Sequence, residues 1–187
     1  MSQTNGHTCP WWLIPTFDNP LRRWVHRPQQ ILGSYVRPGD RVLDVGCGMG
    51  YFTLPLARLA GPTGRVVAAD LQPQMLEGLR RRAEKAGLLG QIQMVQCSPE
   101  RIGVAGPLDF ALAFWMVHEV RKPEPFLAEI RDALKPGGQL LVIEPVIHVT
   151  ERAFEQTLTL AQGLGFRLEQ RPHVRVSRAA LLCKETG

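Results

Sequence analysis

The sequence predicts an α/β fold with a mostly parallel sheet, and three observations support this prediction. From about residue 28 onward, short apolar runs alternate with helical patterns. One run, Arg41–Gly46, is almost entirely apolar, as expected for a strand covered by helices on both faces. The last two runs, Arg167–Pro172 and Val174–Lys184, are too closely joined to be parallel neighbours, because a parallel crossover takes about a dozen residues or more. One strand near the sheet edge should therefore be reversed.

The first half of the chain is expected to supply four strands and two helices. The first helix, Phe52–Gly61, ends at a glycine that suits a helix C-cap. The second helix, Pro73–Gly87, has proline in its first turn and ends at glycine. The strands are Arg41–Gly46, Arg65–Asp70, Gln91–Ser98 and Leu108–Val117. The last of these is the most apolar run of the chain, which is typical of a central strand.

The second half is expected to continue the alternation. A helix over Pro123–Gly138 should break near Pro136, and a strand follows at Gln139–Pro145. A further helix, Glu151–Phe166, leads to the closing pair of strands. The whole pattern fits one sheet without internal repeats.

The length favours a single domain, because 187 residues suffice for one sizeable core. Within it, residues 1–36 form a segment rich in Trp and Pro, and residues 37–187 form the main body of the domain. The part from His7 to Val36 shows no strand pattern. We expect this segment to pack over the open end of the sheet, as a lid.

The composition is that of a soluble globular protein, with 44% apolar and 21% charged residues. No apolar run approaches the roughly 20 residues needed to span a bilayer. The N-terminal stretch lacks the basic leader and long apolar region of a secretory signal, so a cytoplasmic location is expected. The net charge of +5 leaves nucleic acid or an acidic substrate open as partners.

The four cysteines are scattered without paired spacing, which favours reduced thiols over disulfides or a zinc site. His7 and Cys9 could be half of a metal site, but a flexible segment is the simpler interpretation, and no metal is expected. The densest basic cluster, Leu79–Gly87, includes Glu84 within a helical pattern, which is typical of a solvated helix face.

A glycine-rich turn, VLDVGCGMGYF, follows the first strand. Gly46, Gly48 and Gly50 alternate there, with Cys47 between the first two, at the strand end where open α/β sheets bind ligands. Glycine is needed where φ is positive or where a Cβ would strike the ligand. The GxGxG spacing differs from the GxGxxG of dinucleotide sites, and no P-loop is present. Asp44, just ahead of the turn, would repel a phosphate and suit a cationic ligand such as S-adenosylmethionine.

The second strand ends at Asp70, where a carboxylate can accept hydrogen bonds from both ribose hydroxyls of a nucleoside. Leu71 and Met75 are candidates for apolar contact with the adenine. The adenine edge would be met after the third strand, by Cys97, Ser98 and Pro99.

Four motifs together resemble the class I S-adenosylmethionine-dependent methyltransferases. They are VLDVGCGMG, VVAAD, LDFALAFWMVHEV and ALKPGGQLLVIEP, in the family's order and spacing, and the resemblance covers roughly Pro28 to Lys184. It implies a Rossmann-like three-layer sandwich with a seven-stranded sheet, order 3-2-1-4-5-7-6, strand seven antiparallel. It also makes residues 37–187 a methyltransferase domain with S-adenosylmethionine as cofactor and S-adenosylhomocysteine as product. The small ubiquinone and menaquinone C-methyltransferases are the branch that the chain resembles most.

The fourth-strand motif bears on the methyl acceptor. Enzymes that methylate exocyclic amino groups of DNA bases carry an Asp or Asn followed by two prolines and an aromatic residue here, and cytosine C5 enzymes a Pro-Cys pair, whereas this chain has FWMVHEV. Phe114 is a candidate for cofactor contact and Trp115 for acceptor contact, although both could simply be core residues.

A general base is needed only if the acceptor must lose a proton. His118, just past the fourth strand, is the first candidate, with His148 and His26 after it. The alternative for His118 is a loop histidine bonded to backbone or to Glu119, and Glu144 is expected to close the fifth strand's end structurally.

The N-terminal segment is expected to cover the acceptor. Its apolar rings and its arginine would contact the acceptor's apolar part and an acidic group, respectively, or the rings merely seal the sheet; these residues are Trp11, Trp12, Phe17, Arg22 and Trp24. The expected partner is a small, partly apolar molecule, with nucleic acid disfavoured and a monomer or homodimer as the assembly. The alternatives are an RNA or protein methyltransferase, a non-catalytic S-adenosylmethionine-binding protein, and a nicotinamide oxidoreductase, against which the GxGxG spacing speaks.

Overall fold

The computed structural model describes residues 26–186. In these residues the helices are α3 (Pro28–Leu32), α4 (Thr53–Ala60), α5 (Pro73–Lys85), α6 (Pro123–Ala133) and α7 (Glu151–Gly163). The strands are β1 (Arg41–Val45), β2 (Arg65–Asp70), β3 (Ile92–Gln96), β4 (Leu108–Phe114), β5 (Leu134–Pro145), β6 (Phe166–Gln170) and β7 (Ser177–Lys184). Two short 3₁₀ helices, Leu89–Gln91 and Val117–Glu119, precede β3 and follow β4.

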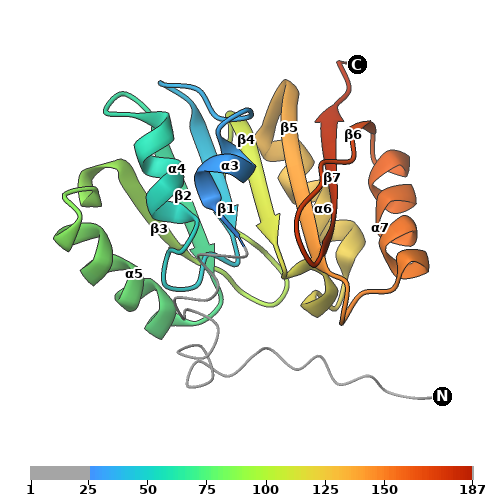
Figure 1. Cartoon of the computed structure of the whole chain (residues 1–187), viewed down its shortest axis with the longest axis horizontal. Coiled ribbons are helices and arrows are strands. Elements are labelled where there is room, and N and C mark those ends of the chain that lie inside the picture. The colour runs from blue at the N-terminus through green and yellow to red at the C-terminus, as the bar shows by residue number, and fades with distance from the viewer. Residues whose placement is uncertain (1–25, 187) are drawn as a thin grey trace.

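The seven strands form one sheet in the order β3-β2-β1-β4-β5-β7-β6. β7 runs antiparallel to both of its neighbours, and the other pairs are parallel, which Figure 1 shows in the opposed arrowheads of β7 and β4. The predicted fold class, strand order and reversed strand are therefore confirmed.

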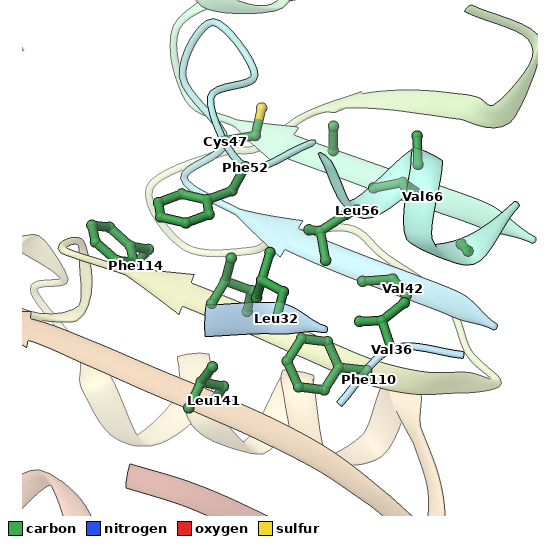
Figure 2. Packing of buried hydrophobic residues seen from close by; sticks show 14 of the residues in the cluster. Leu32, Val36, Val42, Cys47, Phe52, Leu56, Val66, Phe110, Phe114 and Leu141 are labelled. Carbon is green, nitrogen blue, oxygen red and sulfur yellow. The ribbon is translucent and has the colours of Figure 1, made fainter. Parts of the chain in front are cut away.

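The sheet is packed on both faces, which makes a three-layer sandwich. Alternate residues of β1 show this: Val42 belongs to one apolar cluster and Leu43 to the other. The first cluster lies under α3, α4 and α5, and the second under α6 and α7. Figure 1 shows α3 in front of the central strands and α6 behind them, and Figure 2 shows the first cluster close up, with Leu32 of α3 above Phe110 and Leu141.

Several predicted boundaries need correction; for example, the helix expected over Glu151–Phe166 ends at Gly163. The fourth strand ends at Phe114, not Val117, because Trp115 has a φ of 56° that no strand accommodates. The fifth strand starts at Leu134, and the residues around Pro136 that were expected to break the preceding helix form an exposed irregularity in the pairing with β4. The last strand begins at Ser177 instead of Val174.

The end of the N-terminal segment is partly described. It forms α3, whose Leu32 packs with Val36 on the first face of the sheet. Residues 1–25 lie outside the described residues, so the lid expected for residues 1–36 stays a prediction. Among residues 26–186 no helix has the length and apolarity to cross a membrane.

Candidate functional site

The glycine turn follows the carboxyl end of β1. Its three glycines all have positive φ, but a Cβ would meet different surroundings at each of them. A Cβ on Gly50 would lie 2.3 Å from Leu79 Cδ1, so this glycine lets α5 pack against the turn. A Cβ on Gly46 would lie 3.1 Å from Met116 Cβ. A Cβ on Gly48, in contrast, would meet no atom of residues 26–186 within 4 Å. Of the three glycines, and as far as the described residues go, Gly48 is therefore the one at which a ligand could lie against the backbone.

Asp70 ends β2 directly beside Gly48. Its Oδ2 accepts the Gly48 N–H at 2.8 Å and its Oδ1 accepts the Gln72 N–H at 2.9 Å. The residue is 9% exposed, and burial raises the pKa of its carboxyl, while the backbone N–H donors lower it in part. A carboxylate so placed joins the turn to the end of β2 and has lone pairs left for further donors.

Asp44, which we expect to favour a cationic ligand, makes a hydrogen bond inside the protein. The side chain is 2% exposed, and its Oδ2 accepts the Thr53 hydroxyl at 2.6 Å. Thr53 is the first residue of α4, so this bond ties β1 to the helix that follows the glycine turn. Thr53 was not among the residues predicted for the site, although a threonine at the start of a helix that follows a buried aspartate is a recognisable pairing.

The remaining cofactor candidates differ in exposure. Leu71 lies at the surface with 38% exposure, whereas Met75 is fully buried. Cys47 is buried in the turn, and burial raises the pKa of its thiol well above the usual value. After β3, the Ser98 hydroxyl accepts the N–H groups of Glu100 and Arg101 within a tight loop that also contains Cys97 and Pro99.

Aromatic rings gather at the carboxyl end of β4. Phe114 lies 4.2 Å from Phe52, centroid to centroid, and 5.3 Å from Trp115; Figure 2 shows Phe114 facing Phe52. His26 meets Phe114 and Trp115 edge-on and donates from Nε2 to the Arg175 carbonyl at 3.1 Å. Because a carbonyl only accepts, this nitrogen of His26 carries a proton and is a donor.

His118 and His148 meet at the carboxyl ends of β4 and β5. Their rings stack with centroids 5.9 Å apart and planes 10° apart. His118 Nδ1 lies 2.5 Å from Glu144 Oε2, and this hydrogen bond, opposed by burial, raises the pKa of His118 above 6.5. The ring is thus held by Glu144 and not by Glu119, which was one of the alternative partners, and Glu144 does more than close its strand.

The structure thus brings most of the predicted site residues to one edge of the sheet. The glycine turn and Asp70 meet on one side of that edge, and His118 and His148 meet on the other. The ring of His26 contacts Phe114 and Trp115, so His26 belongs to the aromatic group at the end of β4. The acceptor candidates Trp11, Trp12, Phe17, Arg22 and Trp24 lie outside the described residues, and so do His7 and Cys9.

Comparisons with known proteins agree with this geometry. A family model described as "Methyltransferase domain" matches residues 42–138, just over half of the chain. The ubiquinone/menaquinone biosynthesis C-methyltransferase UbiE of Ectopseudomonas mendocina is 39% identical over 112 residues, which are 59% of this chain and 44% of that protein. The chain spans about half the length of the curated relatives it matches.

Solved structures give the same fold. A SAM-dependent methyltransferase from Aquifex aeolicus superimposes with a TM-score of 0.84 at 24% identity, covering 94% of this chain and 98% of that one. Aeropyrum pernix fibrillarin, in complex with natively bound S-adenosyl-L-methionine, superimposes with a TM-score of 0.64 at 18% identity, covering 79% and 68%.

The seven-stranded sheet with its one reversed strand is the fold of class I methyltransferases. More particularly, the chain belongs to the methyltransferase domain family. Over 59% of its length it is similar to UbiE.

Proposed function

We propose that the protein transfers a methyl group from S-adenosylmethionine to a small, partly apolar molecule. The observation that carries the proposal is the hydrogen bond between Gly48 and Asp70 at 2.8 Å, at a glycine whose Cβ position has no atom of residues 26–186 within 4 Å. The relatives that act in ubiquinone and menaquinone biosynthesis, at 35 to 40% identity, support a small acceptor over a macromolecule.

The residues present fit the cofactor. Asp70 is positioned to accept hydrogen bonds from the ribose hydroxyls, and each charge-assisted bond contributes roughly 1.5 to 3 kcal/mol. Because Gly48 has no Cβ, its backbone can approach the ligand closely. Leu71 is exposed enough to contact the adenine, and the loop at Ser98 would supply contacts to the adenine edge. The bound cofactor supplies a methyl group that its sulfonium already activates, so alignment is the protein's main task.

Asp44 has a different role in this proposal. Its bond to Thr53 fixes where α4 begins, and this holds the glycine turn in shape. Buried at this position, its charge also contributes a negative potential behind the turn, which suits a sulfonium better than a phosphate. From its buried position under the turn, Asp44 therefore favours a cationic cofactor over a phosphate-bearing one.

The acceptor side of the edge carries an apolar rim. Ile147 is 79% exposed, and its neighbour Val146 donates its N–H to the carbonyl of Val176, which is also exposed. His148 follows Ile147 directly and stacks on His118. Exposed apolar side chains grouped at a site mark a contact for an apolar ligand. This rim supports an acceptor whose apolar part rests on Ile147 while its polar part faces the histidines.

Release of S-adenosylhomocysteine tests the proposal. The purified protein would be given S-adenosylmethionine with small quinols that lack a ring methyl group, with bulk RNA, or with denatured protein. We expect turnover with the small acceptors alone. Turnover confined to RNA, together with binding that weakens steeply with salt, would favour the RNA alternative and contradict the proposal.

The rim is tested by the substitution Ile147→Ser. It should raise KM for an apolar acceptor by about tenfold or more, because burying this side chain contributes about 1.5 to 3 kcal/mol. S-adenosylhomocysteine affinity should stay unchanged. Leu89→Ser is the matched control, since Leu89 is an exposed leucine before β3, remote in sequence and in the fold from the rim. An equal effect of both substitutions would remove the rim from the acceptor site.

A further inference from the structure

His118 meets a carboxylate that belongs to the neighbouring strand. Glu144 Oε2 lies 2.5 Å from His118 Nδ1, and Glu144 Oε1 accepts the Val117 N–H at 2.8 Å. The Glu144 side chain is 3% exposed and the His118 side chain 26% exposed. A carboxylate shielded from water thus holds one side of a ring whose other side is partly open.

This contact determines which ring nitrogen can accept a proton. An ionised carboxylate only accepts hydrogen bonds, so Nδ1 of His118 must carry the proton that lies between them. In the neutral ring the basic nitrogen is then Nε2, on the side away from Glu144. The bond from the Val117 N–H keeps the carboxylate from turning, because it holds the second oxygen.

Three groups face the ring with charge or titratable atoms. Glu144 of β5 has the largest effect on His118 and raises its pKa, Glu119 on the same 3₁₀ helix acts in the same direction more weakly, and burial opposes them. His148, on the segment after β5, stacks on the ring. The charged imidazolium form of His118 is therefore stabilised, mainly by Glu144.

We propose that Glu144 is a positioning residue that makes Nε2 of His118 the proton acceptor of methyl transfer, an inference that rests on the proposed function. The methylated atom would then carry a weakly acidic proton, as a hydroxyl oxygen or an activated ring carbon does. As that atom gains the methyl group, its proton passes to Nε2, and the positive charge lost from the sulfonium ends on the imidazolium. Acceptors that need no deprotonation, such as a tertiary amine, are not of this class.

The substitution Glu144→Gln separates this role from a structural one. The single amide oxygen must serve the buried Val117 N–H, which leaves the NH₂ group to face His118 Nδ1. Nδ1 would then have to accept a hydrogen bond, so the ring proton moves to Nε2. The basic nitrogen of the neutral ring is then Nδ1, which faces residue 144 and not the open side. The shape of the side chain hardly changes.

Nitrogen NMR of protein labelled with ¹⁵N-histidine measures the tautomer directly, with His118→Gln used to assign the signal. In the wild type we expect neutral His118 to carry its proton on Nδ1 and to titrate above 6.5. In Glu144→Gln we expect the proton on Nε2 and a lower pKa, because the hydrogen bond to a carboxylate is lost. Glu119→Gln is the matched control and should keep the wild-type tautomer.

Two results would overturn the inference. One is a wild-type His118 with its proton on Nε2, which decides the matter even if Glu144→Gln does not fold. The other is a folded Glu144→Gln protein with unchanged tautomer and pKa. Calorimetry with S-adenosylhomocysteine separates this inference from the proposed function. A wild-type protein that does not bind S-adenosylhomocysteine contradicts the cofactor site, whereas the tautomer reports only on Glu144 and His118.

Discussion

At the scale of single residues, Gly48 and Gly50 have the same conformational need and different surroundings. Both have positive φ, 51° and 85°, so an alanine strains the backbone at either position by about 1 to 2 kcal/mol. Gly50→Ala should lower the free energy of unfolding by a further 1 to 3 kcal/mol or so, because its Cβ collides with Leu79. Gly48→Ala should instead weaken S-adenosylhomocysteine binding by about tenfold or more at a smaller cost in stability.

Urea unfolding and calorimetry on the two variants check this pair. Each variant is the control for the other, since the substitution and the backbone region are the same. Equal losses of stability, with cofactor affinity unchanged in Gly48→Ala, would show that Gly48 serves the turn alone.

The residue scale is also where the sequence was least informative. The alternation of glycines could be read directly, but the separate reasons for Gly46 and Gly50 depend on Met116 and Leu79, which only the folded chain brings near. The hydrogen bond between Asp44 and Thr53 could not be predicted, because Thr53 lies nine positions away across a turn whose path the spacing does not specify. Asp70 was placed correctly, because the end of a buried strand needs only the local pattern.

At the scale of elements, the carboxyl end of β5 holds the turn that follows β4. Glu144 bonds both the Val117 N–H and the His118 ring, so the 3₁₀ helix Val117–Glu119 is anchored to a neighbouring strand. The predicted strand ran on to Val117 because its residues stay apolar, and apolarity alone does not reveal the positive φ at Trp115. Nor does sequence pair Glu144 with His118, which are far apart along the chain and adjacent only because β4 and β5 pair.

This anchor predicts a pH dependence of stability. The pKa of His118 is raised in the folded protein, so the charged pair stabilises the fold fully below the unfolded value of 6.5, and this contribution is lost as pH rises through the folded pKa. Urea unfolding of the wild type and of His118→Gln should therefore give curves that differ most below pH 6.5 and converge at alkaline pH. A difference that grows with rising pH would contradict the anchor.

At the scale of the whole molecule, the sheet order was predictable because the family that the four motifs resemble has this order. The reversed strand was predictable from the short connection between the last two strands. Parallel strands then place every strand end that matters at one edge, so residues from β1, β2, β4 and β5 share a site. The acceptor side was less predictable. Its exposed rim at Ile147 lies beyond the end of the fifth-strand motif, in residues that belong to no motif, and part of the expected lid lies in residues 1–25.

The most direct test of the cofactor site is a calorimetric titration of the wild type and of Asp70→Ala with S-adenosylhomocysteine, with NAD as the comparison ligand. We expect the wild type to bind S-adenosylhomocysteine and not NAD, and Asp70→Ala to bind at least about tenfold more weakly, because it loses charge-assisted bonds to the ribose. Tight binding of NAD without any response to S-adenosylhomocysteine would contradict the account.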